Sequence, residues 1–207
     1  MSAIGRAAPL PVSFFQRPAA EVAQDLLGRV LVSRLGGTLA AGRIVETEAY
    51  LGATDPASHA WGGRRTPRNE ALFGPPGTWY VYRSYGMHWC ANLVTAPADT
   101  GGAVLLRAVE PVEGLEEIRR RRAGVPDRAL CAGPGRLAQA LAITRAVDGL
   151  AQSRASGLWV VEGEPLGTGG VERTPRIGIT RAADWPLRFA EAGTRWASRP
   201  PRVQRMS

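Results

Sequence analysis

The chain has 207 residues, which is enough for one domain with a sizeable core. Its formal net charge is +8, and a basic surface of this kind favours a polyanion such as DNA, RNA or an acidic membrane. All 26 basic residues are Arg. Because Lys is absent, the composition nearly excludes enzymes that need a Lys amine, such as Schiff-base lyases and P-loop NTPases, and leaves only the N-terminal amine for an imine.

The first quarter of the chain predicts a flexible leader at residues 1–17, followed by a domain at 18–207. Pro18 opens a short helix, and Gly36-Gly37 is a hairpin signal between two apolar runs. We expect a helix at 18–27, strands at 29–34 and 38–41, and an alternating strand at 43–50.

Residues 51–77 form a long irregular stretch, which in a compact domain is usually functional or disordered, and its aromatic and His content favours function. A second hairpin follows around Tyr85-Gly86. The later expected elements are strands at 78–84, 88–94, 103–109, 159–161, 176–180 and 187–191, helices from Pro111 and at 133–143, and a surface loop at 163–174.

Cys90 and Cys131 are too few for a disulfide framework or a four-Cys zinc site. The first 18 residues lack the apolar core of a signal peptide, and no apolar run approaches 18 residues. We therefore expect a monomeric cytoplasmic protein, nucleoid-associated if bacterial, that is neither secreted nor membrane-bound.

Glu46, Glu48 and Tyr50 share one face of the predicted strand at 43–50. A carboxylate is the group that activates water or stabilises an oxocarbenium-like sugar when a glycosidic bond is cleaved. A solvated strand face explains the same spacing, and the spacing does not say which Glu acts.

His59 lies in the long loop near Trp61, Arg64 and Arg68, a mixture that suits stacked bases and phosphates, although a lone His is more often structural. Tyr85 is at a hairpin tip, where a core side chain is unexpected and a wedge between bases is one use.

Arg107 is a single charge in an apolar run and needs a partner if it is buried. Glu48 is the partner that we favour, and a strand-end surface Arg is the alternative. The basic run at 119–122 suits a solvated helix end. Gly133-Pro134 at a helix start is either an anion site or only a turn. His88 and Cys90 share a strand face, but two ligands do not make a metal site, so we expect no metal and no cofactor.

Taken together, the chain from about Leu26 to Trp196 resembles the alkyladenine (3-methyladenine, methylpurine) DNA glycosylase family. The resemblance rests on several long blocks in the same order. These are Gly-Arg-Ile-Val-Glu-Thr-Glu-Ala-Tyr (42–50), Thr-Pro-Arg-Asn (66–69), Tyr-Val-Tyr-Arg-Ser-Tyr-Gly-Met (80–87), Val-Leu-Leu-Arg-Ala-Val-Glu-Pro (104–111), Leu-Cys-Ala-Gly-Pro (130–134), Gln-Ala-Leu-Ala-Ile (139–143) and Arg-Ile-Gly-Ile (176–179). His88, Trp89 and a shortened stretch at 182–186 depart from it.

The resemblance implies an α+β fold: a single compact domain with a curved, mainly antiparallel sheet, flanking helices and a protruding hairpin. It also assigns roles to individual residues. Glu48 matches the general base, with Arg107 and the backbone carbonyl of Ile177 holding the attacking water; Tyr50, His59, Tyr82 and Asn92 match the base pocket; Tyr85 and Met87 match the intercalating tip; and Arg64, Arg68 and Arg136 match phosphate contacts.

The implied activity is base-excision repair of double-stranded DNA that contains damaged purines, alkylated or deaminated, without a required protein partner. The flipped purine is released by a Glu-activated water, leaving an abasic site without lyase chemistry. Two other interpretations stay open: a non-catalytic nucleic-acid-binding module, and a hydrolase of small N-glycosides.

Overall fold

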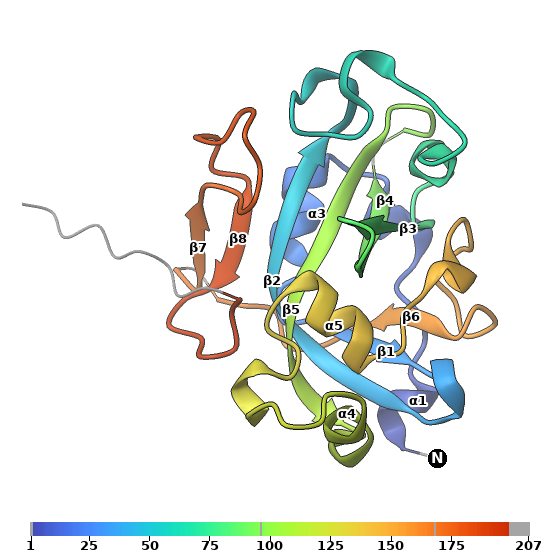
Figure 1. Cartoon of the computed structure of the whole chain (residues 1–207), viewed down its shortest axis with the longest axis vertical. Coiled ribbons are helices and arrows are strands. Elements are labelled where there is room, and N and C mark those ends of the chain that lie inside the picture. Colours follow the sequence, from blue (N-terminus) through green and yellow to red (C-terminus); the bar gives the residue numbers. More distant parts are fainter. Residues whose placement is uncertain (1, 96, 168, 199–207) are drawn as a thin grey trace, which may run out of the picture.

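The computed structural model describes residues 2–95, 97–167 and 169–198 (Figure 1). Eight antiparallel strands form one open sheet in the order β3-β4-β5-β2-β1-β6, and β8 pairs with both β2 and β7. The expected α+β domain is confirmed. The strands are β1 (Val30–Ser33), β2 (Ala40–Leu51), β3 (Trp79–Ser84), β4 (His88–Thr95), β5 (Gly102–Glu113), β6 (Leu158–Val161), β7 (Val171–Thr174) and β8 (Arg188–Glu191).

Short helices surround the sheet. In Figure 1, α5 crosses in front of β5 while α3 lies behind β2. The helices are α1 (Ala3–Arg6), α2 (Val12–Phe15), α3 (Ala19–Asp25), α4 (Leu115–Arg121) and α5 (Pro134–Ala140), with 3₁₀ turns η1 (Leu35–Gly37), η2 (Gly52–Thr54), η3 (Trp61–Gly63), η4 (Glu70–Phe73), η5 (Asp127–Ala129) and η6 (Arg145–Val147). In the described part of the chain, no helix has the length and apolarity to cross a bilayer.

Strand β2 positions the chemistry, because its two faces meet different surroundings. The Thr47 hydroxyl donates to the carbonyl of Ala23 in α3, so this face points into the helix-covered core. The opposite face carries Glu46, Glu48 and Tyr50, as the alternation predicted. Neither Glu is solvated, since both are fully buried, and the solvated-face interpretation is therefore wrong.

Two irregularities interrupt the pairing of β2 with β5 beside these carboxylates. Ile44 pairs with Val109 and Glu46 with Ala108, which leaves Val45 as an extra residue on β2. Thr47 then pairs with Leu106, which leaves Arg107 as an extra residue on β5. Bulges of this kind change the direction of a side chain, and here they occur where Arg107 meets Glu46.

The helix expected to start at Pro111 is a wrong prediction. Strand β5 continues to Glu113, and Pro111 pairs with Gly42 at another register shift, a place where a missing N–H is tolerated. A Cβ on Gly42 would lie 2.4 Å from Val109, so the close approach needs glycine. Helix α4 starts only after Gly114, whose φ is +71°.

The C-terminal part also differs from expectation. Residues 176–180 form no strand, while β7 lies inside the region expected as a surface loop and pairs with β8. Paired strands need not be apolar when they are at a sheet edge, so the polar sequence of β7 gave no signal.

Residues 2–17 are ordered against the domain, in contrast to the flexible leader that we expected. Leu10 and Phe15 are buried in the main core, and the backbone of Leu10 donates to Val160 of β6. Apolar burial by these two side chains stabilises the segment.

Candidate functional site

Glu48 is a fully buried carboxylate with three hydrogen-bond donors around it. Its Oε1 accepts the backbone N–H of Ile177 at 2.8 Å and lies 3.1 Å from Nη1 of Arg107. Its Oε2 accepts the hydroxyl of Tyr50 at 2.9 Å. Burial raises the pKa of Glu48, and Arg107 opposes that rise most strongly. A buried carboxyl with a raised pKa is suited to taking a proton near neutral pH.

Glu46, two residues away, has a different set of partners. Its Oε1 accepts from Nε of Arg107 at 3.0 Å and from Nε of Arg188 at 2.6 Å. Ser198 donates both its backbone N–H, at 2.6 Å, and its hydroxyl, at 2.8 Å. Burial works to raise the pKa of Glu46, but Arg107 and Arg188 outweigh it and hold the pKa below its usual range. The predicted pairing of Arg107 with Glu48 is present, and the second pairing, with Glu46, was missed.

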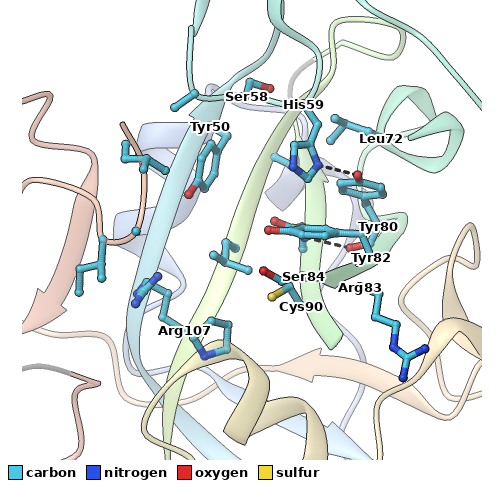
Figure 2. A pocket seen from close by; sticks show the side chains of 18 of the residues that line it. Tyr50, Ser58, His59, Leu72, Tyr80, Tyr82, Arg83, Ser84, Cys90 and Arg107 are labelled. Carbon is cyan, nitrogen blue, oxygen red and sulfur yellow. Dashed lines mark hydrogen bonds between the residues drawn. The ribbon is translucent and has the colours of Figure 1, made fainter. Parts of the chain in front are cut away.

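A cavity of about 500 Å³ lies beside the partners of Glu48. The three partners of Glu48, namely Tyr50, Arg107 and Ile177, all line it. Figure 2 shows the ring of Tyr50 on one side and those of His59 and Tyr82 on the other, with Arg107 below. The structure thus brings together the residues expected at a base pocket: Tyr50, His59, Tyr82 and Asn92 all line the cavity.

His59 is held in place by two tyrosines. Its Nδ1 lies 2.7 Å from the hydroxyl of Tyr80, and its ring meets Tyr82 edge-on with centroids 4.5 Å apart. Burial lowers the pKa of His59, and the charge of Arg64 lowers it further, so both favour the neutral ring. A neutral imidazole bonded at one nitrogen keeps the other for a ligand. Asn92 is buried and donates to the carbonyl of Tyr80.

A buried ion pair supports the other wall. Arg176 and Asp55 are both fully buried, with Nη2 donating to Oδ1 at 2.9 Å. The Arg176 guanidinium lies 4.6 Å from the centre of the Tyr50 ring, on which it forms a cation–π contact. The pair therefore links the loop after β2 to the segment that carries Ile177. Sequence reasoning missed it, because the partners are 121 residues apart.

The comparisons with known proteins identify the family. A family model described as methylpurine-DNA glycosylase (MPG) matches residues 13–195. The chain belongs to the methylpurine-DNA glycosylase family. A relative from Koribacter versatilis is 47% identical over 95% of this chain and 96% of its own. Human DNA-3-methyladenine glycosylase is 44% identical over 96% of this chain and 71% of its own, and the mouse protein of that name is 45% identical.

In this member of the methylpurine-DNA glycosylase family, the β3–β4 hairpin has an exposed tip beside the cavity. Tyr85 is 85% exposed with a φ of +50°, and Met87 is also exposed. An exposed ring on a left-handed backbone position is unusual. Arg83 stacks on Trp89 on the flank of the same hairpin.

A second hollow, more polar than the first, adjoins the first cavity and shares His59 and Tyr82 with it. Five arginines line it: Arg64, Arg68, Arg83, Arg145 and Arg181. Among the residues that the structure describes, no acid forms an ion pair with any of them. The structure thus brings Arg64 and Arg68 together, whereas Arg136 lies apart, exposed on α5. Arg83, Arg145 and Arg181 had not been singled out from the sequence.

His88 and Cys90 do not form part of a metal cluster, since no group of three His, Cys, Asp or Glu side chains with that geometry occurs within the described ranges. Cys90 is buried and lines the base cavity, where burial raises the pKa of its thiol. Cys131 is buried in the main core.

Proposed function

We propose that this glycosylase excises alkylated and deaminated purines from double-stranded DNA by hydrolysis, with Glu48 as the general base. One observation carries the proposal: a buried carboxylate with a raised pKa has as its partners Tyr50, Arg107 and Ile177, three residues that line an aromatic cavity. Flat ligands stack on rings such as those of Tyr50, His59 and Tyr82, and a cationic alkylpurine gains further from electron-rich faces.

The hydrogen-bond partners of Glu48 leave one acceptor position for the water that we propose. A carboxylate has about four acceptor positions, and Arg107, Ile177 and Tyr50 occupy three of them. One position on Oε2 is therefore available to a water molecule. The carbonyl of Ile177 and the guanidinium of Arg107, which line the same cavity, are the further water contacts that we propose.

The reaction then balances without a covalent enzyme intermediate. The water oxygen bonds to C1′ of the flipped nucleotide while the C1′–N bond breaks and its electron pair leaves with the purine. Glu48 takes the water proton. A cationic purine such as 3-methyladenine leaves as a neutral base, whereas neutral hypoxanthine needs hydrogen bonds near His59 to help it leave. The product is an abasic site, and the absence of Lys argues against lyase chemistry.

Binding of DNA follows from the exposed features. Tyr85, with Met87, is the side chain that we propose to fill the gap left by the flipped nucleotide, and each base–aromatic stack contributes about 1–3 kcal/mol. That gain offsets the unstacking cost of a few kcal/mol. Arg64, Arg68 and Arg136 are the proposed phosphate contacts.

The testing experiment measures purine release from duplexes that carry 3-methyladenine, 7-methylguanine, hypoxanthine or ethenoadenine, with the matching free nucleosides in parallel. We expect release from at least one duplex and none from free nucleosides, and borohydride should trap no DNA adduct. Release from nucleosides alone would favour a small-glycoside hydrolase, and binding without release a non-catalytic module.

A further inference from the structure

Glu46 is the buried titratable group that the proposed mechanism leaves without a task. Its carboxylate is fully buried and bonded to Arg107, Arg188 and Ser198. A buried charge of this kind costs several kcal/mol of desolvation, and a well-packed apolar side chain would often be as stable. Stability alone is therefore a weak explanation for it.

The geometry of Arg107 indicates what Glu46 does. All three guanidinium nitrogens of Arg107 have partners: Nε donates to Glu46 at 3.0 Å, Nη2 to the Ser198 hydroxyl at 3.2 Å, and Nη1 lies 3.1 Å from Glu48. Because a guanidinium is planar and rigid, fixing Nε and Nη2 fixes the direction of Nη1.

The backbone alone leaves that direction open. Arg107 is the extra residue at the bulge of β5, where regular pairing with β2 is interrupted. Glu46 is on the neighbouring strand at the same bulge, and Arg188 of β8 holds its carboxylate from the other side at 2.6 Å. Arg188 also donates to the hydroxyl of Thr174 in β7, so the anchor includes the C-terminal strands.

We propose that Glu46 is a positioning residue that, with Ser198, orients Arg107 toward Glu48. The inference rests on the proposed role of Glu48 as general base. Strand β8 and the segment at Ser198 therefore influence the reaction through Glu46 and Arg107, without contacting the nucleotide.

Glu46 also acts on Glu48 through its charge. The groups that face Glu48 are Arg107 of β5, Tyr50 and Glu46 of β2, Cys90 of β4 and the N–H of Ile177. The negative charge of Glu46 raises the pKa of Glu48. Removal of that charge alone would lower the pKa of Glu48, whereas a misplaced Arg107 would raise it, because Arg107 lowers that pKa more strongly than Glu46 raises it.

The test compares single-turnover excision by wild type, Glu46→Gln and Glu48→Gln across pH. Glu46→Gln keeps an acceptor for Nε of Arg107 but loses the charge. We expect its plateau rate to fall about tenfold to a hundredfold, as for other small misplacements of catalytic groups. The acid limb of the profile should move to higher pH, because a misplaced Arg107 opposes the raised pKa of Glu48 less strongly, while affinity for the lesion duplex stays unchanged.

Glu191→Gln is the matched control, because Glu191 forms a half-buried ion pair with Arg43 in the same sheet. Its pH profile should superpose on that of wild type. If Glu46→Gln does not fold, Ser198→Ala tests the same inference, since it removes only the hydroxyl between Arg107 and Glu46. A severalfold slower rate at an unchanged melting temperature supports the inference, and a wild-type rate overturns it.

A Glu46→Gln profile identical to wild type, or an acid limb that moves to lower pH at an unchanged plateau rate, contradicts the positioning role and leaves Glu48 as base untouched. Wild-type excision by Glu48→Gln would instead overturn the proposed function and, with it, this inference.

Discussion

Glu46 and Glu48 lie on one face of β2, but their neighbours shift the pKa values of the two carboxyls in opposite directions. Burial acts to raise the pKa of both, but two arginines hold the pKa of Glu46 below its usual range, whereas Glu48 shares one arginine and its pKa is raised. Divergent pKa values in a close pair are typical of sites that need one fixed charge and one proton acceptor. This separation supports the proposed role of Glu48 as a base beside Glu46.

The first prediction concerns pH. A base must be ionised, so the single-turnover rate should fall as pH decreases through the raised pKa of Glu48, at a higher pH than for an ordinary Glu. Tyr50→Phe keeps the ring but removes a hydrogen bond that favours the ionised carboxylate, so it should move the acid limb to still higher pH. An acid limb that does not move in Tyr50→Phe would count against Glu48 as the titrating group.

The sequence could place these residues on one face but could not rank them. Period-two alternation gave the shared face of Glu46, Glu48 and Tyr50, and the structure confirms it. The ranking depends on Arg188 and Ser198, which are 142 and 152 residues from Glu46. Contacts at that separation leave no local signal, and only the family resemblance singled out Glu48.

At the scale of elements, the site lies where regular structure is interrupted. The bulges between β2 and β5 place Arg107 by its carboxylates, and the irregular segment at Ile177 donates to Glu48. Period and turn signals predicted most strands and both hairpins. They failed at Pro111, where a helix start was expected, and at β7, where a surface loop was expected. In both places pairing with a neighbouring strand overrides the local sequence preference.

The second prediction tests the link between the two loops of the pocket. Asp55→Asn leaves the buried Arg176 without its countercharge, and breaking such a pair typically costs about 3–5 kcal/mol of unfolding free energy. Urea denaturation checks this, with Glu70→Gln as control, since its pair with Arg65 is at the surface and should matter little. Equal unfolding curves for Asp55→Asn and wild type would contradict the structural role of the pair.

At the scale of the whole molecule, the arginines behind the net charge of +8 differ in whether an acid pairs with them. The arginines of α4 are matched by acids, as in the pair of Arg120 with Glu117, whereas those of the polar hollow are not. Composition predicted a polyanionic partner, but it could not say which arginines are available, because ion pairing is decided by the fold. The hollow beside the Tyr85 tip is where we expect the DNA backbone.

The third prediction follows from counterion release. Affinity for duplex DNA should fall steeply with salt, and Arg64→Ala should reduce the slope of log K against log salt by about 0.9, the value for one phosphate contact. Arg120→Ala, which removes an arginine already paired with Glu117, should leave the slope unchanged. Equal slopes for Arg64→Ala and wild type would exclude Arg64 as a phosphate contact.

The most direct test of the central claim is the single-turnover excision rate of Glu48→Gln on a lesion duplex, measured together with its affinity for that duplex. The carbonyl oxygen of Gln can still accept from Arg107 and Ile177, and its amide NH2 can donate to the Tyr50 hydroxyl, but Gln cannot take a proton from water. We expect a rate lower by about 10²–10⁴-fold, the usual contribution of a general base, at an unchanged Kd. Excision at the wild-type rate would contradict that claim.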